Sequence, residues 1–357
     1  MRLLYLTRDC TLHDARWLRA LAGHVSALAF LSLRATPSPV FRADHPRVDF
    51  LPASAADEAA VVAAVKAWQP DVILAGPLTD AGHLAVRHWP ERTLLASWAF
   101  DVLHEPLHDP DAALRLRETL RLGRHLFTDA AFLQDTCADL AGHPFVHTCV
   151  LPWGLAAEDM PTPRLGWRAN DEQPAARVVL HARGFSAVHR PLHALDCFRL
   201  ARAEDPRLRL WLAGDGPLRA EIEASVRASD LAGHVRFLGH LPPADLAGCL
   251  AEADVYFACA ACDGSSITLL QAMHAGLPCV ASDLPGNRAW LADTGAWLVP
   301  PDQPAATARA LLAAAALPAP DRAALAARLR HSVAARADLS VNLPRLLHTL
   351  RLVAAHA

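Results

Sequence analysis

The feature that most constrains this chain is the alternation of short apolar runs with longer segments of helical periodicity. In the first half, strand-like runs are separated by amphipathic segments, as seen at RLLYLT (2–7), VSALAFLSL (25–33), DVILAG (71–76) and TLLASW (93–98). Such alternation is typical of βαβ units, and therefore of parallel sheets with helices on both faces. We expect the first half to form one doubly wound α/β sheet.

The alternation restarts after a polar, proline-rich interval at 156–176, whose composition is typical of a linker. Strand-like runs then follow at RVVLHA (177–182), LRLWLAG (208–214), HVRFLG (234–239) and DVYFACA (254–260). We predict two Rossmann-like doubly wound domains, 1–156 and 157–339, facing each other across a cleft. Ligands of such sheets bind at the carboxyl ends of the strands, so the cleft is the expected site.

Composition excludes several classes of function. The chain has 357 residues and a formal net charge of −3, whereas a nucleic-acid-binding protein is usually basic. No apolar run approaches the ~18–20 residues of a membrane span, and the N-terminus lacks a signal-peptide pattern. The eight cysteines are scattered and the 19 histidines form no metal-binding motif. We therefore expect a cytoplasmic protein with no metal, no nucleic-acid partner and at most peripheral membrane contact.

One loop in the second half suits an anion. The sequence DGSS, residues 263–266, follows a strand-like run and precedes the helical run ITLLQAMHAG. Small residues allow close approach to the unpaired backbone N–H groups at a helix N-terminus, where the helix dipole favours a phosphate. The alternative is that Asp263 or Ser265 only caps the helix.

Two neighbouring segments add to this interpretation. Arg183 and Arg190 lie in ARGFSAVHRP (182–191), directly after a predicted strand, where a pair of arginines can clamp a diphosphate. The alternative is two solvated surface charges. The turn LAGDGPLR (212–219) contains GxGP, which by itself is weak evidence of a ligand loop.

These motifs together resemble the retaining glycosyltransferases of family 4, also called glycosyltransferase group 1, which have the GT-B fold. The resemblance is carried in chain order by five segments, of which the last is the most specific: LPWGL (151–155), HARGFSAVHRP (181–191), LAGDGPLR (212–219), HVRFLGHLPPADL (234–246) and the block 253–291. The first half matches more loosely, through HDARWLRALAGH (13–24) and SWAFDVL (97–103).

The resemblance implies a metal-independent enzyme that moves a sugar from a nucleotide-sugar donor, such as a UDP- or GDP-sugar, and retains the anomeric configuration. It implies no cofactor beyond this co-substrate, a donor mostly on the second domain, and an acceptor (a glycan, a lipid-linked or a small molecule) mostly on the first. By position, Arg183 would contact the diphosphate together with Arg190 or His189. Asp263 would contact the sugar hydroxyls, and Gln271 would reach the ribose. The diphosphate or donor sugar would be held by the backbone amides of Gly264, Ser265, Ser266 and Ile267.

The sequence departs from the family pattern at several positions. The family's pair of acidic residues appears as Asp263 and Gln271, Ala289 stands where many relatives have Glu, and the loop TRDCTLHDARW (7–17) lacks glycines, so that His13 or Arg16 could line it. These departures leave open a catalytically inactive or repurposed protein that acts as a scaffold or partner subunit. A nucleotide-sugar epimerase is a weaker alternative.

Asp101 is the candidate catalytic residue of the first domain, with His104 and Glu105 as neighbours; solvation of a loop or capping of a helix is the alternative. Arg117, Arg121 and Arg124 lie near one face of a predicted helix and would be solvated or touch an anionic surface. The last predicted helix, within 340–357, has the apolar stripe needed to cross back onto the first domain.

Overall fold

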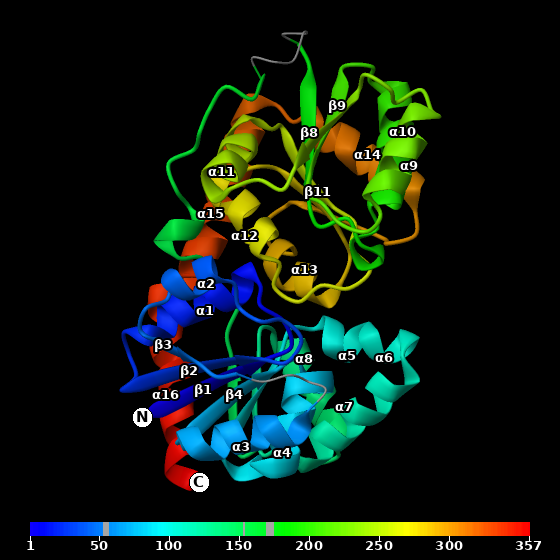
Figure 1. Cartoon of the computed structure of the whole chain (residues 1–357). Coiled ribbons are helices and arrows are strands. Elements are labelled where there is room, and N and C mark those ends of the chain that lie inside the picture. Colours follow the sequence, from blue (N-terminus) through cyan, green and yellow to red (C-terminus); the bar gives the residue numbers. More distant parts are fainter. Residues whose placement is uncertain (53–56, 153, 169–174) are drawn as a thin grey trace. The chain divides into compact units, whose positions relative to one another are not determined.

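The computed structural model describes the chain except residues 53–56, 153 and 169–174. It contains two compact units, Met1–Pro152 with Ser340–Ala357, and Trp153–Leu339 (Figure 1). The sequence analysis placed the corresponding boundary after residue 156. Trp153 of the LPWGL segment, and residues 169–174 of the expected linker, lie outside the described residues.

The first unit is built on a seven-stranded parallel sheet with the order β3-β2-β1-β4-β5-β6-β7. Its inner strands are continuous apolar runs because both faces of the sheet are covered by helices. The strands are β1 Arg2–Thr7, β2 Ala27–Ser32, β3 Val48–Phe50, β4 Val72–Gly76, β5 Thr93–Ser97, β6 His125–Thr128 and β7 His147–Val150.

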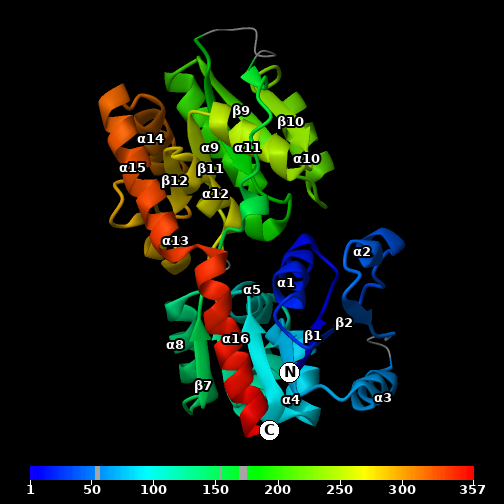
Figure 2. The same ribbon diagram turned by 90° about the vertical axis from the view of Figure 1, so that its left-hand side faces the viewer.

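Several helices of the first unit begin at a residue whose side chain caps the helix. Thr11 and Asp14 form a capping box at the start of α1. The α-helices are α1 Leu12–Ala22, α2 Pro39–Ala43, α3 Glu58–Trp68, α4 His83–His88, α5 Phe100–Leu103, α6 Glu105–His108, α7 Pro110–Leu122, α8 Ala131–Ala141 and α16 Leu339–His356. Helix α16 lies beside β7 (Figure 2). The rings of His147 and His356 approach to 3.3 Å between Nε2 and Nδ1.

The second unit is built on a six-stranded parallel sheet with the order β10-β9-β8-β11-β12-β13. Its strands are β8 Arg177–Ala182, β9 Leu208–Ala213, β10 Val235–Gly239, β11 Val255–Ala258, β12 Cys279–Ser282 and β13 Trp297–Val299. Its helices are α9 Pro191–Glu204, α10 Arg219–Arg227, α11 Pro243–Glu252, α12 Ile267–Ala275, α13 Pro285–Leu291, α14 Pro304–Ala315 and α15 Ala319–Arg336.

Two apolar clusters cover the two faces of the second sheet. One contains Val178 and Leu180 of β8 with residues of α11, α12, α13 and α15, and the other contains Val179 with residues of α9, α10 and α14. Successive side chains of β8 therefore point to opposite faces, as a strand requires. Helices α9 and α12 consequently lie on opposite sides of the sheet.

The expected α/β class is confirmed in both units, with local differences. The segment after β4 contains a π-helical turn, Leu78–Gly82, followed by α4. The segment 97–106 contains the four-residue helices α5 and α6. Helices this short contain too few residues to show a 3.6-residue hydrophobic period, so the pattern could not predict them.

Candidate functional site

The strand order of the second sheet reverses at β8, which lies between β9 and β11. In open parallel sheets, ligands bind at the carboxyl ends of the strands where the order reverses. The residues that directly follow β8 and β11 are therefore the structural candidates for a site. These are the loop from Arg183 to Arg190 and the loop from Cys259 to Ser266.

Arg183 connects these two loops. Its Nη2 lies 2.9 Å from Oδ2 of Asp263, and its Nη1 donates to the hydroxyl of Ser266. The side chains of Arg183 and Asp263 are only 9% and 13% exposed, so the ion pair is largely desolvated. Removing one partner of such a buried pair typically costs about 3–5 kcal/mol because the other charge is left without compensation.

The loop after β11 leads directly into the N-terminus of α12. Ser266 is the N-cap, and its hydroxyl accepts a hydrogen bond from the amide of Leu269. The hydroxyl of Ser265 accepts a hydrogen bond from Trp290 Nε1 at 3.2 Å. A Cβ on Gly286 would lie 2.2 Å from the carbonyl oxygen of Gly264, so α13 supports this loop at very close range. The helix start, which is the positive end of the helix dipole, is thus held beside Arg183.

The positive charge of the site resides on Arg183. Burial lowers the pKa of His181 to about 4, and burial together with Arg183 lowers the pKa of His189 to about 3, so both rings are neutral near pH 7. Burial raises the pKa of Asp263, and the adjacent guanidinium of Arg183 opposes that rise. A ligand anion would therefore meet one buried guanidinium, one carboxylate and a helix N-terminus.

Gly214 and Gly216 allow the turn after β9 to lie against the Arg183 loop. A Cβ on Gly214 would lie 2.1 Å from the carbonyl oxygen of Arg183, and one on Gly216 would lie 2.6 Å from that of Phe185. The amide of Phe185 also donates to the carbonyl oxygen of Asp215 at 2.9 Å. The GxGP turn therefore positions the loop that carries the arginine.

His189 and Arg190 lie in the same loop but make other contacts. Nδ1 of His189 lies 3.0 Å from the carbonyl oxygen of Gly184, to which it can donate. Arg190 donates from Nη1 to the carbonyl oxygen of Pro301 and forms an ion pair with Asp302 at 2.6 Å. Arg190 thus connects the end of this loop to the segment after β13, whereas the predicted diphosphate clamp paired it with Arg183.

Gln271 also makes a contact that its sequence position did not suggest. Its Nε2 donates to the backbone carbonyl of Asp159 at 2.8 Å. The side chain thereby connects α12 to the 3₁₀ turn Ala157–Asp159.

Asp101, in the first unit, is completely buried. Its carboxylate accepts hydrogen bonds from the amide of Leu78, the hydroxyl of Ser97 and the amide of Trp98. Burial raises its pKa to about 6, and the same three donors oppose that rise. This arrangement organises the segments that follow β4 and β5, and it is the arrangement expected of a structural carboxylate.

The sequence analysis missed a second buried arginine, Arg8, which directly follows β1. Its Nε lies 2.8 Å from Asp80 Oδ2 and its Nη1 lies 2.6 Å from Glu105 Oε1. Arg34 contacts the other oxygen of Asp80 at 3.2 Å. Its position in the sequence could have indicated it, because Arg8 follows the strand-like run RLLYLT and Arg183 follows the strand-like run RVVLHA, each directly at the strand end.

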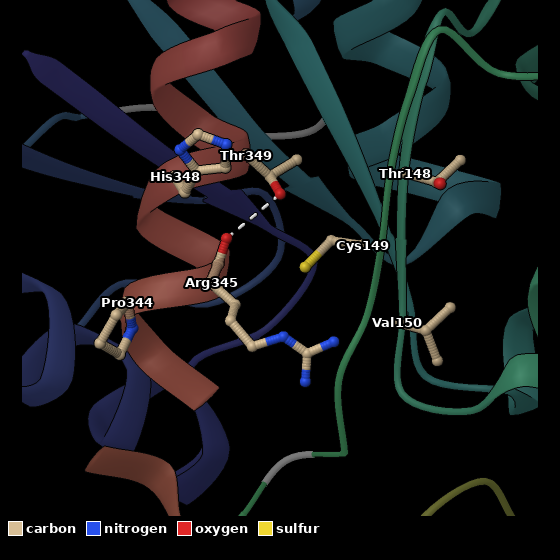
Figure 3. A pocket seen from close by; sticks show the side chains of 7 residues that line it. All are labelled: Thr148, Cys149, Val150, Pro344, Arg345, His348 and Thr349. Atoms are coloured by element: carbon tan, nitrogen blue, oxygen red, sulfur yellow. Dashed lines mark hydrogen bonds between the residues drawn. The ribbon is translucent and has the colours of Figure 1, made fainter. Parts of the chain in front are cut away.

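A separate cavity of about 390 Å³ lies in the first unit between β7 and α16 (Figure 3). It is lined by Thr148, Cys149, Val150, Pro344, Arg345, His348 and Thr349.

Among the described residues, no group of three or more His, Cys, Asp or Glu side chains could hold a metal ion. Within the same ranges, no single helix is long and apolar enough to cross a bilayer; α14 and α15 pass that test only as a pair bent by 107°.

Residues 176–316 match the model of the family described as Glycosyl transferases group 1. The chain is 38% identical over 268 residues to a phosphatidyl-myo-inositol mannosyltransferase of Mycobacterium leprae, covering 66% of this chain and 68% of that protein. It is 42% identical over 114 residues to the protein of the same description from Mycolicibacterium smegmatis, covering 31% of this chain and 28% of that protein. The Bacillus subtilis protein EpsF, whose description is "putative glycosyltransferase", matches over 32% of each chain at 32% identity. The chain thus spans about a third of the length of the last two relatives.

Solved structures share the fold over the whole chain. The Anabaena protein HepE, solved in complex with UDP, superposes with a TM-score of 0.80 at 17% identity, covering 99% of this chain and 100% of that one. Sucrose-phosphate synthase from Thermosynechococcus elongatus gives a TM-score of 0.78 at 19% identity, with both chains fully covered. These similarities agree with the expected GT-B fold, and the sequence matches show that the chain belongs to the group 1 glycosyltransferases.

Proposed function

We propose that the protein transfers a sugar from a nucleotide-sugar donor and that its second unit binds the donor diphosphate. The observation that carries this proposal is the contact of buried Arg183 with the start of α12 through Ser266. A guanidinium and a helix N-terminus together are the groups that stabilise the charge developing on a departing nucleoside diphosphate. Membership of a glycosyltransferase family, and the UDP bound to HepE, support the same assignment.

In this mechanism Arg183 receives the leaving diphosphate, and the amides of residues 264–267 bind its oxygens. Asp263 orients the guanidinium and accepts from sugar hydroxyls. We propose that the configuration at the anomeric carbon is retained and that transfer proceeds without a metal, with the leaving phosphate serving as the base. The donor is a UDP- or GDP-sugar, and the acceptor is a glycan, a lipid-linked sugar or a small molecule. The contacts of Arg190 support a role in holding the loop of Arg183.

The proposal is tested first by thermal shift with UDP, GDP and ADP and with their sugars, because a ligand that binds only the folded protein raises its melting temperature. The donor found in this way is then used to measure release of the nucleoside diphosphate, with and without EDTA, and the product anomer is assigned by NMR. We expect stabilisation by UDP or GDP, turnover in EDTA and a product of unchanged configuration.

The control is Arg183→Ala, which removes the guanidinium. A single stabilising charge at a developing anion is typically worth a factor of about 10²–10³ in kcat, and we expect a loss of that order. If wild-type protein binds a nucleotide but releases none from any common nucleotide sugar, the scaffold alternative is favoured. Little change in rate for Arg183→Ala would refute the role of the arginine.

A further inference from the structure

The side chain of Gln271 is fixed by a partner that only a hydrogen-bond donor can satisfy. Its Nε2 lies 2.8 Å from the carbonyl oxygen of Asp159. Because a carbonyl accepts and never donates, this contact requires the NH₂ end of the amide and leaves Oε1 as the remaining acceptor. Gln271 lies four residues after Ile267 and shares a face of α12 with it, one turn from the start of the helix.

The carbonyl belongs to a turn of the second unit that is held by its own hydrogen bonds. The carboxylate of Asp159 accepts from the amide of Ala156 at 2.8 Å, and the amide of Asp159 donates to the carbonyl of Ala156 at 3.0 Å. Leu155, just before the turn, donates to the carbonyl of Ala337 and packs in the same apolar cluster as Leu270 of α12. The contact of Gln271 therefore joins a well-formed turn to the helix whose N-terminus is the candidate anion site.

We propose that Gln271 is a positioning residue that holds the turn 157–159 against α12, and that a carboxylate at this position would break the contact. A glutamate has the same length but, when ionised, has no proton to donate to the carbonyl of Asp159. It would also place a negative charge against the carbonyl oxygen of Asp159. The amide is thus required by the carbonyl that it contacts, and it is not a weaker substitute for an acidic residue.

The consequence for substrate binding rests on the proposed function. If the start of α12 binds the diphosphate, loosening the turn one helical turn away lowers donor affinity. Replacing Gln271 by glutamate should then weaken nucleotide binding, although a carboxylate is normally the stronger acceptor for ribose hydroxyls. The sign of this effect separates a positioning role from a direct ligand role.

The test compares Gln271→Glu with Gln271→Met, which keeps the length without a hydrogen bond. Hydrogen exchange of peptides covering 155–160 and the melting temperature are measured at pH 8 and at pH 5, with UDP and GDP affinity as a further readout. At pH 8 we expect faster exchange in both variants, more so in Gln271→Glu, and an affinity loss in that variant of roughly tenfold, the size of one lost hydrogen bond.

The pH dependence provides the specific signature. An introduced glutamate would be partly buried and would face the carbonyl oxygen of Asp159, which favours its protonated form and raises its pKa above the ordinary value of about 4.3. At pH 5 a protonated glutamate can again donate to the carbonyl of Asp159, so the deficit of Gln271→Glu relative to wild type should shrink. The deficit of Gln271→Met should not change with pH.

The proposal is refuted if Gln271→Glu at pH 8 matches wild type in exchange and melting temperature, or if its deficit has the same size at both pH values. Hydrogen exchange and the melting temperature can both be measured without catalytic turnover. A failure to find any nucleotide-sugar donor would therefore contradict the proposed function and leave the result on Gln271 interpretable by itself.

Discussion

Each of the two sheets has a buried arginine at the same topological position, but the groups around the two arginines differ. Arg8 follows β1 and contacts Asp80, which lies after β4; Arg183 follows β8 and contacts Asp263, which lies after β11. In each sheet these are the adjacent strands at which the order reverses. Arg8, however, has a second carboxylate at 2.6 Å, that of Glu105.

This difference in surrounding charge affects which of the two arginines can bind an anion. The guanidinium of Arg8 lies between two carboxylates, so an approaching phosphate would meet negative charge on both sides. Arg183 has one carboxylate, a serine hydroxyl and the start of α12, and its Nε has no hydrogen-bond partner among the described residues. The two arginines therefore differ in the charge around them, and this difference supports the proposed assignment of the donor diphosphate to the second unit.

The largest expected effect comes from displacing the Arg183 loop. Gly214→Ala would place a Cβ 2.1 Å from the carbonyl of Arg183, and Gly76→Ala would place one 2.2 Å from the carbonyl of Ala96 in the first unit. Both variants should lose stability, typically about 1–3 kcal/mol for overpacking. Only Gly214→Ala should also weaken nucleotide binding, which we expect to fall about a hundredfold.

Melting curves and calorimetric titration with UDP and GDP measure the two effects separately. Gly23→Ala is the matched control, because a Cβ there meets nothing within 4 Å. Equal losses of nucleotide affinity in Gly214→Ala and Gly76→Ala would contradict the assignment of the diphosphate to the second unit.

A smaller effect is expected at Arg190. If this residue only holds its loop, then Arg190→Ala and Asp302→Ala should both have small effects, with that of Arg190→Ala somewhat larger because it also removes the hydrogen bond to Pro301. Since Asp302 is 83% exposed, we expect a stability change of at most about 1 kcal/mol and a change in donor KM of roughly threefold or less. Steady-state kinetics would expose a direct phosphate contact as a much larger loss in Arg190→Ala than in Asp302→Ala.

The smallest expected effect on nucleotide binding is that of Asp101, whose contribution to stability depends on pH. Its pKa is about 6 in the folded protein, whereas an unfolded aspartate titrates near 3.9, so the folded state binds the proton more tightly. This group therefore contributes stability that is present below about pH 4 and is lost as the pH rises to about 6, a contribution of up to roughly 3 kcal/mol.

Asp101→Asn removes that titration and places an NH₂ group among donors. We expect its melting temperature to lie below that of wild type by a difference that grows as the pH falls from 7 to 4.5. Nucleotide affinity per folded molecule should stay unchanged. A difference in melting temperature that does not vary with pH would argue against a buried, titrating carboxylate.

The sequence predicts the two α/β units because continuous apolar runs and helical periods are properties of each segment. It also indicates Arg183, Asp263 and residues 264–267, because strand ends and helix starts can be located from the pattern. Arg190 and Gln271 could be placed along the chain, but their partners Asp302 and Asp159 are about 110 residues away in sequence. Contacts over such separations depend on the folded sheet, which local patterns do not encode.

The surroundings of Asp101 could not be predicted from local sequence patterns either. A polar residue in SWAFDVL looks like a solvated loop residue, and its burial follows only from α5 and from the segment after β4, whose Leu78 amide it binds. Arg8 was missed although its strand-end position matches that of Arg183. What distinguishes the two arginines is the number of carboxylates around each, and that number depends on tertiary structure.

The most direct test of the central claim compares nucleotide binding by Arg183→Met and Arg8→Met. Methionine keeps much of each side chain's apolar stem and removes its charge. With UDP or GDP in a calorimetric titration, we predict that Arg183→Met loses binding by at least tenfold, the value of one charge-assisted hydrogen bond, while Arg8→Met retains wild-type affinity per folded molecule. Retained affinity in Arg183→Met, or an equal loss in both variants, would contradict the placement of the diphosphate at the start of α12.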